Sequence, residues 1–229
     1  MVFIVPALRP SVIFATLASA TLLGTAALQA VGEVSPYVAV GYSAERRFAA
    51  LSGGDYAAGD SLWSKDMVLR DCLEVGESLY AKVQPTARRA GFYASCLNQA
   101  QSMTREMPAY SRAWLAVAVA ADGLGLSDQM ADALHQSSLT APHVHFLAER
   151  RVALAVRRWN GLDEQVQQAL ESDMRTLLDS SGGARALAVI YVDYPQHRER
   201  LTRIAEGAPA DLQRRFLGEV DRRLRQVAS

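Results

Sequence analysis

The chain has 229 residues, half of them hydrophobic, and its formal net charge at pH 7 is zero. This length is sufficient for one sizeable core or a short helical array. A zero net charge excludes the general attraction to nucleic acid or to an anionic surface that a basic protein has, so no nucleic-acid partner is expected. Alanine, leucine and arginine, which all favour helices, are the most frequent residues of the sequence, and this composition predicts an all-α fold.

Residues 11–31 form an apolar run without a charged side chain. A helix of this length, at about 1.5 Å per residue, spans the ~30 Å hydrocarbon core of a bilayer. Arg9 precedes the run and Glu33 follows it, so the positive-inside rule places the N-terminus in the cytoplasm and the body outside. Residues 1–32 are therefore expected to be a signal anchor, a single-pass transmembrane helix in a bacterial inner membrane.

A cleavable signal peptide is the alternative interpretation of the same run. The segment Ala18-Ser19-Ala20 and the end of the run at Ala27 offer the small residues that signal peptidase requires. Both interpretations export the body of the protein to the periplasm, anchored in the first case and released in the second.

Residues 33–60 are expected to be an irregular spacer between the membrane and the body. Glycine, proline and serine interrupt the pattern, for example at Pro36, Gly41 and Gly59. Residues 44–51 are compatible with one short helix. The all-α domain is expected to occupy residues 61–229.

The first helical hairpin of this domain is expected over residues 62–107. An apolar face extends from Leu62 to about Val83, and Pro85 then breaks the helical pattern. Proline is well suited to the first turn of a helix, and a second helix is expected from there to about Glu106.

Cys72 and Cys96 are the only cysteines, and each lies twelve residues from Gln84 at the turn of this hairpin. Residues at equal distances from the turn of an antiparallel hairpin lie level with each other. An exported body also meets an oxidising environment. We therefore predict a disulfide between Cys72 and Cys96, and two buried free thiols are the alternative.

Residues 113–142 predict two amphipathic helices joined by a tight turn. Gly125 is suited to a positive φ angle at the end of the first helix. Ser127 is suited to capping the second helix, because its side-chain oxygen can accept from a free N–H group. An ordinary helical hairpin in an all-α domain satisfies this pattern.

The spacing of Trp114, Gly125, Leu134 and Pro142 resembles that of a tetratricopeptide repeat. The resemblance implies a short stack of antiparallel helical hairpins whose concave surface binds peptides or other proteins. It also implies that Trp114 is buried between helices. In such a stack the first helix would line the partner-binding groove with Arg112, Leu115, Val119 and Asp122.

A third hairpin and a C-terminal group of helices are expected to complete the stack. The last helix has an apolar stripe opposite its arginines, as expected for a terminal cap with one docked face. The expected helices cover about 145–159, 163–178, 184–194, 195–206 and 210–227.

The sequence contains no motif for catalysis, cofactor binding or metal binding. His143 and His145 lie two positions apart, where helical side chains do not face one another, and His135 and His197 are isolated. There is no glycine-rich phosphate loop and no nucleophile elbow. We therefore expect no cofactor, no metal, no small-molecule substrate and no enzymatic activity.

The helices expected over about 145–159 and 210–227 each contain two arginine pairs. These pairs either form a docking surface for an acidic partner or an anionic polysaccharide, or are the hydrated sides of their helices. The pairs are Arg150-Arg151, Arg157-Arg158, Arg214-Arg215 and Arg222-Arg223.

These features predict a membrane-anchored extracytoplasmic scaffold that binds protein partners in a bacterial envelope assembly. Protein export, envelope polysaccharide production and a bioenergetic complex are all compatible settings. An accessory single-pass subunit of a larger membrane complex is the second hypothesis, and an envelope hydrolase is the third. Deletion of residues 1–32 separates the first two, because only the scaffold should keep its partner.

Overall fold

The computed structural model describes residues 10–39, 41–54, 56 and 58–228. This part of the chain is helical and contains no strand, which confirms the all-α prediction. The helices are α1 (Pro10–Ala39), α2 (Ala44–Gly53), α3 (Leu62–Glu77), α4 (Leu79–Lys82), α5 (Thr86–Glu106), α6 (Ser111–Leu124), α7 (Ser127–Thr140), α8 (His145–Ala155), α9 (Glu164–Leu178), α10 (Ser181–Asp193), α11 (Arg198–Glu206) and α12 (Ala210–Ala228).

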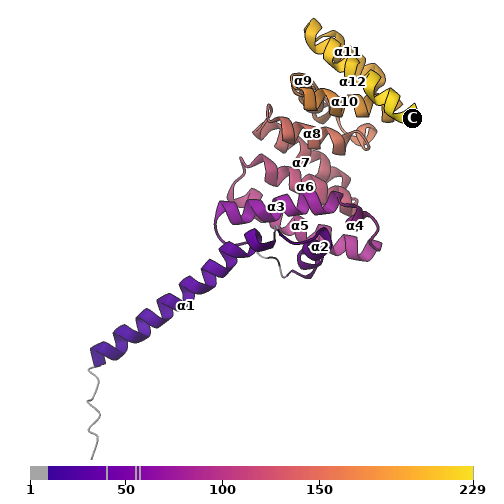
Figure 1. Cartoon of the computed structure of the whole chain (residues 1–229). Coiled ribbons are helices and arrows are strands. Elements are labelled where there is room, and N and C mark those ends of the chain that lie inside the picture. The colour runs from indigo at the N-terminus through magenta and orange to yellow at the C-terminus, as the bar shows by residue number, and fades with distance from the viewer. Residues whose placement is uncertain (1–9, 40, 55, 57, 229) are drawn as a thin grey trace, which may run out of the picture.

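The helices after α1 lie one above another in approximate chain order, while α1 projects away from them as a single long rod (Figure 1). The group α2 to α5 lies nearest to α1, and α11 and α12 lie at the far end of the body (Figure 1). Consecutive helices form the main contacts, with α6 packed on α5 and α7, and α8 on α9.

Helix α1 is long and apolar enough to cross a membrane, and it is the only such helix in the described residues. Its side chains from Ser11 to Val31 are all exposed. The helix does not end near Glu33 as expected, but continues to Ala39 with Pro36 inside it. Proline lacks the N–H that would bond to the carbonyl of Gly32, and the Ser64 hydroxyl of α3 donates to that carbonyl at 3.5 Å instead.

The junction between α1 and the body is closely packed. The Glu33 carboxylate accepts hydrogen bonds from the backbone N–H of Ser61, at 2.7 Å, and from the Ser61 hydroxyl. A Cβ atom added to Gly59 would lie 2.5 Å from Glu33 Oε1, so only glycine allows this approach. The expectation of an irregular spacer over residues 33–60 is therefore wrong, because α2 and this junction belong to the folded body.

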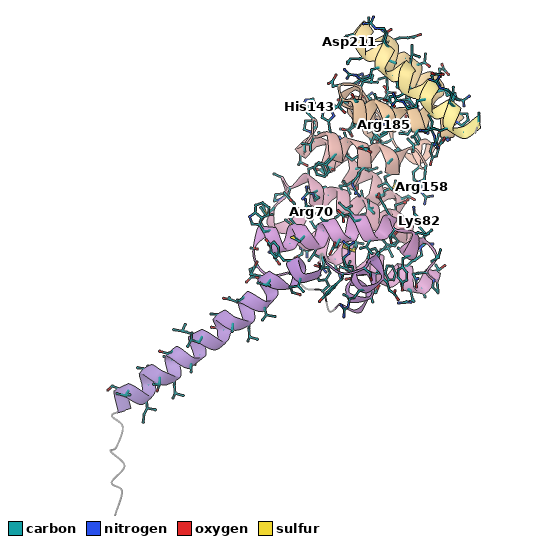
Figure 2. All side chains as sticks on the ribbon, in the orientation of Figure 1. Arg70, Lys82, His143, Arg158, Arg185 and Asp211 are labelled. Carbon is teal, nitrogen blue, oxygen red and sulfur yellow. A yellow bond between two sulfur atoms is a disulfide. The ribbon has the colours of Figure 1, made fainter. Side chains whose placement is uncertain are left out.

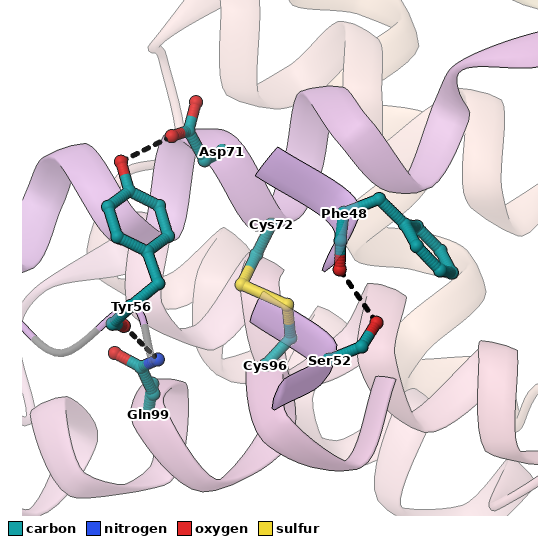
Figure 3. The surroundings of a disulfide bond; sticks show 7 residues. All are labelled: Phe48, Ser52, Tyr56, Asp71, Cys72, Cys96 and Gln99. Atoms are coloured by element: carbon teal, nitrogen blue, oxygen red, sulfur yellow. Dashed lines mark hydrogen bonds between the residues drawn. A yellow bond between two sulfur atoms is a disulfide. The ribbon is translucent and has the colours of Figure 1, made fainter. Parts of the chain in front are cut away.

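Helix α2 covers one side of the hairpin formed by α3 and α5. Phe48 of α2 is fully buried and its ring stacks on Phe92 of α5, with centroids 4.8 Å apart. The disulfide between Cys72 of α3 and Cys96 of α5 lies beside Phe48, and its Cα atoms are 5.7 Å apart (Figure 3). Both cysteines are buried. The predicted pairing is confirmed.

The α6–α7 hairpin has the predicted turn but not all of the predicted contacts. Gly125 adopts a φ of 75° and ends α6. Ser127 is the first residue of α7 and does not cap it, because Leu126 occupies the N-cap position. The prediction that Trp114 is buried holds only in part: the residue is partly buried and packs against the main core, and its indole N–H donates to the Pro108 carbonyl at 2.7 Å.

The C-terminal half differs from expectation at two helix ends. Helix α8 ends at Ala155, and Trp159 is buried in a short 3-10 turn after it. Helix α10 begins at Ser181 instead of about residue 184, because the Ser180 side chain accepts from the backbone N–H of Gly183 at 3.0 Å.

A buried ion pair connects α7, α8 and α9. Arg151 of α8 is fully buried, and its Nε and Nη2 atoms donate to the Asp173 carboxylate of α9 at 2.7 and 2.6 Å. The same guanidinium donates to the carbonyls of Ser137 and Ala141 at the end of α7, at 3.1 and 3.2 Å. Arg151 therefore connects the C-terminal end of α7 to α9, and it adds a donor to the Ser137 carbonyl, which also accepts from the Ala141 backbone N–H at 3.3 Å.

We predict that Asp173→Ala lowers the free energy of unfolding by about 3–5 kcal/mol, because it leaves the Arg151 charge buried without a counter-ion. Asp221→Ala is the matched control, since Asp221 forms an exposed pair with Arg225 one helical turn away. Urea denaturation followed by circular dichroism measures both. Equal effects of the two substitutions would contradict the structural role of the buried pair.

Candidate functional site

Two separate hollows border α3, α6 and α8, and α6 packs against both of the other helices. The smaller, of about 200 Å³, is lined by Arg70, Leu73, Glu74, Arg112, Phe146 and Arg150. The larger, of about 750 Å³, is lined by Gly76, Glu77, Lys82, Arg89, Tyr93, Val119, Asp122, Gly123, Ala153, Leu154, Arg157 and Arg158.

The two hollows follow one another along the C-terminal half of α3. Arg70 and Glu74 border the smaller hollow, and Gly76 and Glu77 border the larger one. Figure 2 labels Arg70 of the smaller hollow and Lys82 and Arg158 of the larger one. An ion pair joins the two walls: Arg150 of α8 lies 3.3 Å from Glu77 of α3. We refer to these residues together as the α3–α6–α8 groove.

Three of the four predicted groove residues line this surface. Arg112 lies in the smaller hollow, and Val119 and Asp122 lie in the larger one. Leu115 is fully buried in the core, so its predicted place in the groove is wrong. The reason is that α3 and α8 both pack against α6, which encloses the residue at the middle of the α6 face.

Arg112, predicted to line the groove, also has a structural partner. Its guanidinium pairs with Asp66, a buried carboxylate of α3, and lies 4.9 Å from the centre of the Phe146 ring. The Tyr110 hydroxyl donates to the same carboxylate. Burial and this hydrogen bond to Asp66 raise the pKa of Tyr110 to about 12. Arg112 therefore compensates a buried charge between α3 and α6.

Tyr93 of α5 packs beneath the larger hollow between two glycines. A Cβ atom on Gly123 would overlap the Tyr93 ring, and one on Gly76 would lie 3.3 Å from it. The Tyr93 hydroxyl donates to the Gly76 carbonyl at 3.3 Å. These glycines are needed for the close approach of the ring rather than for a special backbone angle.

The larger hollow carries an excess of positive charge. Glu77 is paired with Arg150, and Asp122 with Arg158 at 2.7 Å. The other cations of the hollow are Lys82, Arg89 and Arg157, and no carboxylate in the described part of the chain forms an ion pair with them. Burial raises the pKa of Tyr93, an effect that the charges of Arg89 and Arg157 partly oppose.

The sequence analysis did not identify most of these residues. It singled out Arg157 as a member of an arginine pair, but not Lys82, Arg89 or Tyr93, which come from α4 and α5. The available signal was the two glycines Gly76 and Gly123, which interrupt otherwise helical stretches and in the structure admit the Tyr93 ring.

A further hollow of about 540 Å³ lies between α9 and α11 near His143. Its arginines are compensated, because Arg175 and Arg203 lie 3.5 and 3.4 Å from Glu171. Within the described residues, His, Cys, Asp and Glu side chains form no group of three or more that could hold a metal ion. The α3–α6–α8 groove is therefore the site with the clearest binding chemistry.

We predict that Arg112→Met destabilises the fold by about 1–3 kcal/mol, because it leaves the buried Asp66 carboxylate without its strongest partner. Asp122→Asn should have a smaller effect, since its partner Arg158 is more than half exposed. Thermal denaturation of both variants is the measurement. An Arg112→Met variant that melts at the same temperature as the unchanged protein would contradict the structural role of Arg112 and leave this residue available for partner binding.

No protein-family model matches the chain, and no curated protein or solved structure matches it. The α3–α6–α8 groove and the apolar helix α1 are the features of the molecule that bear on its function.

Proposed function

We propose that the chain is a membrane-anchored extracytoplasmic scaffold in a bacterial envelope assembly. Its body is a short stack of helical hairpins resembling tetratricopeptide repeats, and α1 is the anchor. The α3–α6–α8 groove binds a segment of a protein partner. No catalytic residue, cofactor or metal is assigned.

The observation that carries this proposal is the uncompensated charge of the larger hollow. Lys82, Arg89 and Arg157 surround a cavity whose own carboxylates are already paired. Guanidinium groups bind carboxylates through charge-assisted hydrogen bonds, frequently two at a time. Complementary charge also raises the association rate and selects the partner. The groove therefore suits an acidic segment of a protein better than a neutral or basic one.

An accessory subunit of a larger membrane complex is the second candidate. The observation in its favour is the closely packed junction of Glu33 with Ser61, which connects α1 to the body without a free linker. A subunit held by its transmembrane helix would need such a junction to keep the body in one orientation. The two candidates differ in which part of the chain holds the partner.

We predict that α1 crosses the inner membrane with the body in the periplasm. Alkaline phosphatase fused after the C-terminal residue should be active, whereas a reporter that works only in the cytoplasm should be silent in the same position. The exposed apolar surface of α1 and the disulfide between Cys72 and Cys96 support this topology. The reverse pattern of reporter activity would contradict it.

We predict that Arg89→Glu with Arg157→Glu abolishes recovery of the partner from membranes solubilised in mild detergent. Arg105→Glu with Arg214→Glu is the matched control, because these arginines are exposed outside the groove. A scaffold lacking residues 1–32 should still bind the same partner, since Glu33 and its contact with Ser61 are retained.

The results of this experiment separate the candidates. Loss of the partner with the groove variant alone supports the scaffold. Loss with the truncated chain, and retention with the groove variant, would support the accessory subunit and contradict binding in the groove.

A further inference from the structure

Large apolar side chains are exposed where α1 meets the body. They belong to two elements: Val34, Tyr37 and Val38 lie in the last turns of α1, and Leu62 and Trp63 in the first turn of α3. Trp63 is 71% exposed, although it belongs to a residue type that is highly buried on average. We refer to these five residues as the collar.

The end of α1 has one face on the body and one face turned away from it. Pro36 and Ala39 are buried, and Glu33 contacts Ser61. Val34, Tyr37 and Val38 are each more than half exposed, and their spacing of three and four residues places them on one side of the helix. The exposed face of the apolar rod therefore continues without a break up to the body.

Helix α3 starts beside the point where α1 reaches the body, and it runs in the same direction as the end of α1. Ser64, in the first turn of α3, contacts Gly32 of α1, and Asp71, two turns later, is connected to Pro36 through the Tyr56 hydroxyl. Side chains of a helix lean toward its N-terminus. The side chains of Leu62 and Trp63 therefore lean toward the apolar part of α1.

The thickness of a bilayer sets the level of the collar. About 20 helical residues fill the hydrocarbon core, and the headgroup layer on each side adds roughly 5–7 Å, or about four residues of helix. If the uncharged run from Ser11 to Val31 fills the core, Val34 lies about 4–5 Å beyond it, within the headgroup layer, and Tyr37 and Val38 lie about 9–10 Å beyond it, just outside that layer. Trp63 is next to Ser64, which contacts Gly32, so it lies at the level of the headgroup layer. Tryptophan and tyrosine are enriched at this level, where one end of the ring is apolar and the other hydrated.

We propose that the collar inserts into the headgroup layer of the bilayer that α1 crosses, and so seats the body directly on the lipid surface. The inference rests on the proposed membrane anchor but not on the groove. The exposed charges next to the collar, such as Asp60, remain hydrated at this level. Trp63 is the principal contact, because it is the largest and most exposed member of the collar.

The test uses the full chain in phosphatidylcholine vesicles and the fluorescence of its three tryptophans, none of which lies in α1. Lipids brominated high on the acyl chain quench tryptophans at the membrane interface. We expect Trp63→Phe to remove most of this quenching. Trp114→Phe is the matched control and should leave it unchanged, because Trp114 lies on the body beside Pro108.

Extraction of the vesicles at alkaline pH distinguishes the failures. A chain that is extracted has no spanning helix, and both the anchor and the collar are then overturned. If the chain stays in the vesicles and Trp63→Phe leaves the quenching unchanged, the insertion of the collar into lipid is contradicted and the membrane anchor is not. The exposed collar would then be a contact surface for another protein. The variant Arg89→Glu with Arg157→Glu should show the same quenching as the unchanged chain. The test of lipid contact is therefore independent of the test of partner binding in the groove.

Discussion

The buried guanidinium of Arg151 is the constraint on which the middle of the structure depends. A fully buried arginine is tolerated only if its charge is compensated and its N–H groups have acceptors. Asp173 supplies the charge, and Ser137 and Ala141 at the end of α7 supply carbonyls. These partners exist only when α7, α8 and α9 are in one relative position.

The same cluster extends to α6. The Ser111 hydroxyl of α6 donates to the Ser137 carbonyl at 2.7 Å. The same carbonyl oxygen therefore accepts hydrogen bonds from both α6 and Arg151. Apolar packing alone tolerates small shifts between helices, whereas a bidentate ion pair has a defined geometry. The cluster thus fixes the position of α8 against α6, and these two helices carry two of the three faces of the groove.

Much of the fold could be predicted from the sequence because local signals decide it. Pro85 and Gly125 mark turns through backbone geometry, and the equal spacing of Cys72 and Cys96 from a turn predicts their pairing. The sequence did not reveal that α1 continues through Pro36. The Gly32 carbonyl, which loses its helical partner at Pro36, accepts a hydrogen bond from the Ser64 hydroxyl, and Ser64 lies far along the chain. It also did not reveal that Leu115 is enclosed by two helices, which depends on packing between hairpins.

The arrangement around Pro36 has a consequence for the order of assembly in the cell. The last turns of α1 depend on Ser61 and Ser64, which leave the ribosome after the apolar run. In the proposed topology, the apolar part of α1 can therefore enter the bilayer before its final turns have their partners. With that topology, the contacts between α1 and the body form only after α3 has crossed the bilayer, so membrane insertion would precede the step that orients the body.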